Sequence, residues 1–285
     1  MDAAQLIDPT SSKVTQRWAS PAFGGALAAV TTAKTVYAVS SNTPDLVRVD
    51  FATNKLASVT VPPAGSVGTT TFGSVFLLGS RVYVSYALGN NDQAASFDAA
   101  TLKAIASTSF PDPLAEYTQM CAIDSAHLAM VGSNSVRILD AATLHNEATV
   151  SVKPSPIGIA CAGGRAYVSN FDSPTGVVIN NAARVTGHFS WQGHGSDTLV
   201  ADAKDGVLFG TDEFAKVVIV CSLTALTCRQ SAPLGSKPTS VGVVNDDIVV
   251  DLENAEQLVV VDRKTLNVVR RLQLNDLPRV AIFIK

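Results

Sequence analysis

Short apolar runs separated by turns rich in Gly, Asn and Asp predict β-strands along the whole chain. Inner strands of such a unit are continuously apolar, whereas an outer strand alternates apolar and polar residues because one side faces solvent. The strands expected in the best-defined unit are 156–162, 165–170, 177–180 and 184–189. No stretch of useful length has helical periodicity. The pattern therefore predicts an all-β chain built from groups of four short strands.

A turn that follows the third strand of each group recurs seven times, most clearly as Val49-Asp50-Phe51-Ala52-Thr53 and Leu139-Asp140-Ala141-Ala142-Thr143. The positions equivalent to Asp are 8, 50, 98, 140, 180, 221 and 262, at intervals of 42, 48, 42, 40, 41 and 41 residues. A period of roughly 40–45 residues with four strands per unit is typical of a β-propeller. We therefore expect a seven-bladed propeller.

The two ends of the chain complete this picture. Residues 4–18 have the pattern of a third and a fourth strand, whereas residues 277–285 have the pattern of a first, inner strand. The prediction is a closing blade shared between the termini, with the inner strand from the C-terminal end and the outer strands from the N-terminal end. Such closure removes the open sheet edges that favour aggregation. Residues 1–285 are thus expected to form one domain.

The second strand of one unit, Tyr167-Val168-Ser169-Asn170, closely resembles the Tyr-Val-Thr-Asn signature of YVTN-type propeller repeats, which include lactonase-like enzymes. Val82-Tyr83-Val84-Ser85 is a weaker match, and the Asp-x-x-Thr turns resemble the turn between the third and fourth strands of that family. The resemblance implies a seven-bladed ring. It implies little about activity, because the family also includes electron-transfer subunits and binding proteins.

Composition narrows the class of partner. The chain has 285 residues, 47% of them hydrophobic and 16% charged, with a net charge of −3. Because no basic patch is present, nucleic-acid binding is not expected. No apolar run is long enough for a membrane span, and no secretory leader is recognisable before the first repeat. We expect a monomer.

The four cysteines bear on the cellular compartment. Cys221 and Cys228 lie seven residues apart on strands expected to face one another, so they are predicted to form a disulfide; the alternative is two reduced thiols. Cys121 and Cys161 occupy similar places in neighbouring repeats and are expected to be small buried side chains. A Cys221–Cys228 disulfide would indicate a secreted or periplasmic protein, and its absence a cytoplasmic one.

Strand direction alternates within a blade, so the repeated turns lie on one face of the ring and the irregular loops on the other. Asp and Thr at the turns are expected to cap their own backbone. Ligand sites favour irregular loops, and the most unusual one is the crossing 188–197, which contains His188, Trp191, His194 and Asp197. An aromatic ring can stack on a small molecule, and an imidazole can transfer a proton. The alternative is a Gly-rich crossing whose Trp packs between blades.

The other candidates lie in loops of the same face. The expected acid–base residues are His194, Asp197, Asp212 and Glu253, and the expected ligand-binding residues are Trp191, Tyr86, Tyr117, Asn170 and Asp172. Asp172, Asp212 and Glu253 come from successive blades, so their oxygens could hold Ca²⁺ or Mg²⁺. The alternative is a set of solvated acids. Because Cys-x-x-Cys and His-x-x-His spacings are absent, zinc is not expected.

Two functions fit these observations. The first is a small-molecule site at the channel mouth, in a non-redox enzyme such as a lactone hydrolase or an isomerase or cyclase. The second is a non-catalytic propeller that docks a protein, peptide or glycan on one face. Only 6% of residues are aromatic, which modestly disfavours a large docking surface. An electron-transfer role is disfavoured because no Cys-x-x-Cys-His motif is present.

Overall fold

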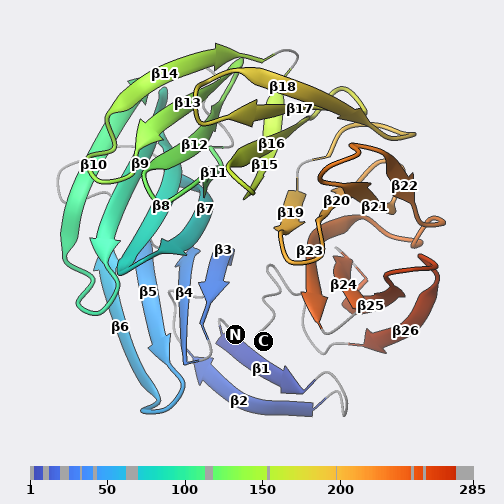
Figure 1. Ribbon diagram of the computed structural model, residues 1–285. Helices are drawn as coiled ribbons and strands as arrows, with labels where there is room; N and C mark the ends of the chain where they lie inside the picture. Colours follow the sequence, from blue (N-terminus) through green and yellow to red (C-terminus); the bar gives the residue numbers. More distant parts are fainter. Residues whose placement is uncertain are drawn as a thin grey trace.

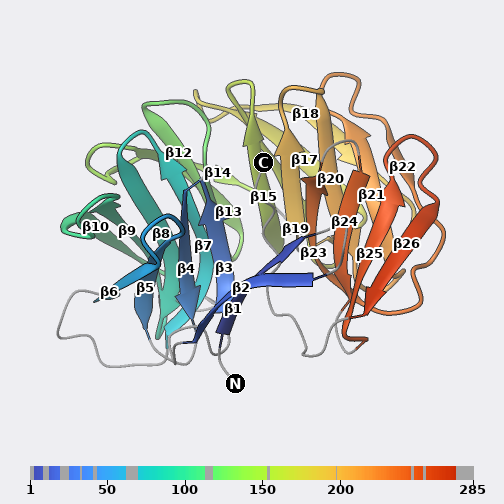
Figure 2. The ribbon, with the colours of Figure 1, turned by 90° about the horizontal axis from the view of Figure 1, so that it is seen from below.

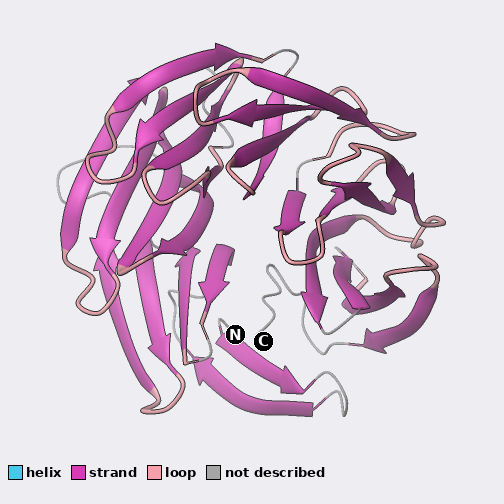
Figure 3. Ribbon diagram, viewed as in Figure 1, coloured by secondary structure: helices cyan, strands magenta, loops and turns pink. Residues whose placement is uncertain are grey.

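A computed structural model describes residues 3–8, 13–19, 26–32, 34–40, 44–61, 70–112, 118–152, 155–196, 198–244, 247–252 and 255–273. The regular elements in these ranges are all strands, joined by turns and loops (Figure 3). No helix that could cross a bilayer occurs within them. The prediction of an all-β chain is confirmed.

Six four-stranded antiparallel sheets are arranged around a central axis as the blades of a propeller (Figure 1). Blade 1 comprises β3 (Ala26–Thr31), β4 (Thr35–Ser40), β5 (Asp45–Asp50) and β6 (Lys55–Thr60), and blade 2 comprises β7 (Thr70–Leu78), β8 (Arg81–Leu88), β9 (Asn91–Asp98) and β10 (Ala104–Pro111). Blade 3 comprises β11 (Met120–Ala122), β12 (His127–Gly132), β13 (Ser135–Asp140) and β14 (Asn146–Ser151), and blade 4 comprises β15 (Pro156–Ala162), β16 (Arg165–Asn170), β17 (Thr175–Asn180) and β18 (Val185–Ser190). Blade 5 comprises β19 (Thr198–Asp202), β20 (Val207–Asp212), β21 (Val217–Ser222) and β22 (Cys228–Gln230), and blade 6 comprises β23 (Pro238–Val244), β24 (Asp247–Leu252), β25 (Gln257–Asp262) and β26 (Val268–Gln273).

The N-terminal strands β1 (Ala3–Asp8) and β2 (Lys13–Ala19) pair with each other as a separate two-stranded sheet. This sheet lies between blade 1 and blade 6, at the place where the ring closes (Figure 1). The two N-terminal strands are therefore present as predicted. The inner strand expected at 277–285 lies outside the described residues. The described chain thus has six complete blades, and the predicted number of seven is not confirmed.

The hydrophobic core is divided among the interfaces between successive blades. One cluster joins blades 2 and 3 through Tyr83, Ala94, Met130 and Leu139, and comparable clusters fill the other described interfaces. The second and third strands are buried almost throughout, whereas outer strands such as β10 alternate between half-buried and exposed residues. Because both surfaces of an inner strand face a neighbouring blade, these strands need the continuous apolar runs seen in the sequence.

The repeated Asp residues cap turns, as predicted. In the turn after β9, the Asp98 carboxylate accepts hydrogen bonds from the Thr101 backbone N–H (2.8 Å) and hydroxyl (2.7 Å). The next residue, Leu102, has a positive φ of 58° and places a buried side chain in the core. The turns that begin at Asp50, Asp140 and Asp262 make the same two contacts with their Thr residues.

The turn of blade 5 begins one residue later than the sequence suggested. The Ser222 carbonyl accepts the N–H of Leu226 and the Ser222 hydroxyl accepts the N–H of Ala225, as Asp98 does in its own turn. Ser222 therefore occupies the capping position. Cys221 precedes it and is buried, so the assignment of Cys221 to the Asp position was wrong.

Two disulfides link strands near the turns. Cys221 and Cys228 lie opposite each other on β21 and β22 and are bonded, which confirms this prediction. Cys121 of blade 3 and Cys161 of blade 4 form a second bond, with a Cα–Cα distance of 5.7 Å. The expectation that they are only small buried side chains was therefore wrong, because β11 and β15 are neighbouring inner strands. Two disulfides point to an extracellular or periplasmic location.

The strands run between two faces of the ring (Figure 2). Because neighbouring strands are antiparallel, the capped turns all lie on one face, the turn face. The loops between second and third strands and the crossings between blades share the other, the loop face. This division was predicted from the sequence, and residues 191–196 of the crossing lie beside the loops 171–174 and 213–216.

Candidate ligand-binding site

The crossing that begins at Trp191 joins β18 of blade 4 to β19 of blade 5 on the loop face, and the structure describes its residues 191–196. Its backbone is fixed near both ends to the blade 4 loop: Trp191 donates its N–H to the Pro174 carbonyl (3.0 Å), and Ser196 donates its N–H to the Asn170 carbonyl (3.1 Å). The crossing is therefore held by backbone hydrogen bonds to ordered strand ends and loops, and it can present His194 in a defined position.

Two glycines around His194 explain the local sequence Gly193-His194-Gly195. Gly193 has a φ of 132°, a left-handed conformation that side chains disfavour, and a Cβ there would collide with the Asp212 carboxylate. A Cβ at Gly195 would collide with the carbonyl oxygen of Phe171. These two positions therefore require glycine, so that the crossing can approach both neighbouring loops.

Asp212, at the end of β20, joins the crossing to the loop of blade 5. Its Oδ2 accepts the backbone N–H of His194 (2.6 Å), and its Oδ1 accepts those of Ala215 (2.8 Å) and Phe214 (3.1 Å). The side chain is fully buried. A buried carboxylate needs such donors, because an ion without partners would be strongly destabilised.

Three rings lie together at this junction of blades 4 and 5. They belong to Phe171, His194 and Phe214, and we call them the aromatic patch. The Phe171 and Phe214 ring centroids are 5.8 Å apart in an edge-on arrangement, and the His194 and Phe214 centroids are 5.4 Å apart. Phe214 is 53% exposed and Phe171 is 36% exposed, and His194 is also exposed. Large apolar side chains gathered at the surface are typical of binding sites.

The two loops that supply the Phe residues of the aromatic patch also carry acidic residues. The Asp172 side chain, next to Phe171, is exposed. Glu213, next to Phe214, forms an ion pair with Lys237 from the crossing between blades 5 and 6. The loops at this junction therefore carry aromatic rings, an imidazole and charged side chains.

Several predicted site residues have other surroundings. Trp191 is buried between blades 4 and 5 and packs on Phe189 with ring centroids 6.0 Å apart, which agrees with the alternative interpretation of this residue. Tyr86 is buried in blade 2, where burial raises the pKa of its hydroxyl to about 12. Neither side chain belongs to the aromatic patch.

Asn170 is buried, and its side-chain amide donates to the Thr175 carbonyl (2.9 Å), so it supports the loop under Phe171. Asp197, Glu253 and Tyr117 lie outside the described residues. Of the predicted residues, His194, Asp212, Asn170 and Asp172 are thus associated with one place, the junction of blades 4 and 5 on the loop face.

Phe214 was not predicted from the sequence. The only signal was its place in the loop after a second strand: Phe214 lies two residues after Asp212, the end of β20, and Phe171 lies one residue after Asn170, the end of β16. Its exposure depends on how blades 4 and 5 pack, and no local pattern records that packing.

A metal site remains a prediction from the sequence. Within the described ranges, no group of three or more His, Cys, Asp or Glu side chains is arranged to hold an ion. Glu253, one of the three expected ligands, lies outside those ranges, and Asp212 already accepts three backbone N–H groups.

A second group of ionisable residues lies buried between blades 2 and 3. Arg137 donates to Asp92 Oδ2 (Nη1–Oδ2 2.6 Å) and its Nη2 lies 3.8 Å from Asp112 Oδ2. Thr118 donates its hydroxyl to Asp92 Oδ1 (2.6 Å), and the guanidinium lies 5.0 Å from the centre of the Phe110 ring. Because these groups satisfy one another away from solvent, we interpret the cluster as a connection between blades.

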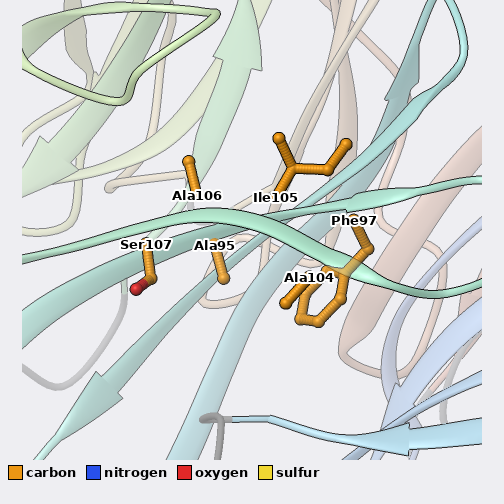
Figure 4. Close-up of a pocket in the computed structure, with 6 residues that line it drawn as sticks. All are labelled: Ala95, Phe97, Ala104, Ile105, Ala106 and Ser107. Atoms are coloured by element: carbon orange, nitrogen blue, oxygen red, sulfur yellow. The ribbon is translucent and has the colours of Figure 1, made fainter.

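A small hollow of about 170 Å³ lies between β9 and β10, lined by Ala95, Phe97, Ala104, Ile105, Ala106 and Ser107 (Figure 4). Its only polar side chain is Ser107. A catalytic site needs convergent polar or titratable groups, so this hollow does not support an active site.

Comparison with solved structures supports the propeller fold, whereas comparison with family models and curated sequences gives no match. No family model and no curated protein sequence matches the chain, so the YVTN resemblance has no support from a family model. Virginiamycin B lyase from Staphylococcus aureus, in selenomethionine form, is similar in structure, with a TM-score of 0.72 and 8% identity over 88% of this chain and 85% of that chain. A catalytically inactive histidine-to-alanine variant of that enzyme with quinupristin gives a TM-score of 0.71 and 8% identity over the same shares. At this identity the similarity shows the propeller fold alone.

Proposed function

We propose that this propeller binds a small molecule at the aromatic patch on its loop face. The observation that carries the proposal is the exposed cluster of Phe171, His194 and Phe214. The backbone that carries these rings is held by hydrogen bonds to Asp212 and by the close approach of Gly193 and Gly195 to neighbouring loops. Rings exposed at fixed positions offer a stacking surface without the entropy cost of ordering long side chains. A ligand with a flat aromatic group fits this surface best.

We further propose that the ligand is a substrate and that His194 is the proton-transfer group. The imidazole is the titratable side chain within the patch, and histidine is the commonest general acid or base in enzymes. Asp197 and Glu253 remain proposed acid–base partners. The reaction class would be non-redox: hydrolysis of a lactone, or isomerisation or cyclisation. The solved structures of similar fold are named as a lyase, which supports a small-molecule reaction on this scaffold by analogy only.

The second candidate is non-catalytic docking of a protein, peptide or glycan on the loop face. The exposure of Phe214 and Phe171 favours it, because exposed aromatic rings are common centres of docking surfaces. Docking would involve rings and charges over several blades, whereas a small ligand would be confined to blades 4 and 5.

Binding of a small molecule at the aromatic patch is tested by nuclear magnetic resonance. The signals of the histidine and phenylalanine side chains are followed during titration with small aromatic compounds and with quinupristin. We expect shifts at His194, Phe171 and Phe214, and at least a tenfold weaker affinity in Phe214→Ala. The control is Phe76→Leu, in blade 2, where Phe76 stacks on Tyr83. Binding of every compound elsewhere, or equal binding by Phe214→Ala, would contradict the proposed site.

Chemistry is tested separately. Any compound that binds is incubated with the protein and followed by liquid chromatography. Conversion that is lost in His194→Ala supports an enzyme. Binding without conversion by the intact protein would favour the non-catalytic alternative.

A further inference from the structure

We infer that Asp212 is a positioning residue, whose carboxylate holds His194 and Phe214 against each other and thereby assembles the aromatic patch. The inference rests on the proposed function for its biological meaning, because it concerns how that site is built. It assigns Asp212 a role different from the acid–base role expected from the sequence.

The contacts of the carboxylate come from two separate segments. Phe214 and Ala215 lie two and three residues after Asp212, whereas His194 lies on the crossing from blade 4. One side chain thus fixes the backbone of both residues whose rings are 5.4 Å apart. A carboxylate that accepts several backbone N–H groups is a strong and directional anchor.

A comparison within the chain separates this role from ordinary turn capping. Asp262, on the turn face, accepts the N–H groups of Lys264 (3.1 Å) and Thr265 (2.6 Å), again two and three residues ahead. Asp212 makes the equivalent local bonds and also accepts the N–H of His194, 18 residues earlier in the chain. The bond across the blades is therefore what distinguishes Asp212 from a turn cap.

The surroundings of Asp212 exclude direct contact with a ligand. Its side chain is fully buried, and both oxygens accept backbone N–H groups. The neighbouring Gly193 lets the crossing come close, because any side chain there would meet the carboxylate. Asp212 therefore acts on a ligand only through the positions of His194 and Phe214.

The first test is hydrogen exchange of the His194 amide in the unaltered protein. We expect strong protection, because the buried carboxylate holds this N–H even though the His194 side chain is exposed. An amide that exchanges as fast as those of exposed loop residues would overturn the inference.

The second test is the histidine ring signal in Asp212→Asn. An Asn side chain of the same size offers one acceptor oxygen in place of two, so the bond to His194 or the bonds to the blade 5 loop must weaken. We expect the His194 ring signal to move towards its position in Phe214→Leu, which lacks the ring current, and the His194 amide to exchange at least tenfold faster. Asp262→Asn is the matched control and should change neither signal.

If Asp212→Asn does not fold, Gly193→Ala provides the same measurement, because it displaces the crossing and keeps the carboxylate. A folded variant of either kind with an unchanged His194 signal would overturn the inference. Because these measurements need no ligand, they can succeed when the proposed binding fails. Conversely, aromatic compounds that bind the patch equally well in wild type and Asp212→Asn would refute the positioning role and leave the proposed function intact.

Discussion

Aspartate residues in this chain have opposite pKa shifts according to their surroundings. The side-chain hydroxyl and backbone N–H of Thr101 lower the pKa of Asp98, and Thr143 does the same for Asp140. At Asp92, burial and a hydrogen bond with Asp112 raise the pKa to about 6, although Thr118 and Arg137 act in the other direction. The turn aspartates therefore favour folding as carboxylates, whereas Asp92 favours it as a neutral acid.

The raised pKa of Asp92 predicts a specific pH dependence of stability. An Asp in an unfolded chain titrates near pH 4, so between about pH 4 and pH 6 the folded state binds more protons than the unfolded state. The contribution of Asp92 to the free energy of unfolding should therefore fall as pH rises through this window, by up to about 2–3 kcal/mol. Because the turn aspartates act in the opposite direction, this contribution is the difference between wild type and Asp92→Asn at each pH. Urea unfolding at intervals from pH 4 to pH 7 measures this change.

Variants identify the responsible group. In Asp92→Asn the fall between pH 4 and pH 6 should largely disappear, because the amide does not titrate. Asp172→Asn, which alters an exposed carboxylate on the same face, should retain it. An unchanged slope in Asp92→Asn would show that another group is responsible.

At the level of strands and turns, the sequence was informative wherever a rule is local. The strand pattern and the Asp-x-x-Thr caps were predicted correctly. The degenerate turn of blade 5 was placed one residue early, because Ser222 replaces Asp and only the observed hydrogen bonds identify the capping position. The sequence comparison of the repeats aligned Cys221, rather than Ser222, with the capping Asp of the other turns.

Contacts between blades could not be predicted from these patterns. The Tyr83 hydroxyl donates to the Ala141 carbonyl in the next blade (2.8 Å), and Tyr167 donates in the same way to the Leu223 carbonyl (2.9 Å). In blade 1, Tyr37 does so with Ala99 (2.8 Å). These three Tyr residues thus connect the second strand of one blade to the turn of the next, which is a structural role that only the packed ring reveals.

The two disulfides should differ in their contribution to stability. Cys121–Cys161 spans 40 residues and joins two blades, whereas Cys221–Cys228 spans seven residues within one blade. Loop-closure entropy predicts about 4 kcal/mol for the first and about 2.5 kcal/mol for the second. Urea unfolding of the paired Cys→Ala variants tests this order. A larger loss on removing Cys221–Cys228 would mean that local packing outweighs chain entropy.

At the scale of the whole molecule, the ring separates a repeated face from a variable one. The turn face consists of capped turns that serve folding. The loop face brings together residues from different repeats, and the junction of blades 4 and 5 gathers Phe171, His194 and Phe214. The sequence identified this crossing and His194 as candidates. It did not identify Phe214, and it left the burial of Trp191 as an alternative to ligand binding, because both depend on how two blades pack.

The most direct test of a ligand site at this junction is a crystallographic screen with small aromatic fragments. We expect fragments to bind preferentially against Phe214 and Phe171, within contact distance of the His194 ring, and we expect Phe214→Ala crystals of the same form to lose that density. Fragments that cluster reproducibly at another place, with the aromatic patch empty and open to solvent in the crystal, would contradict it.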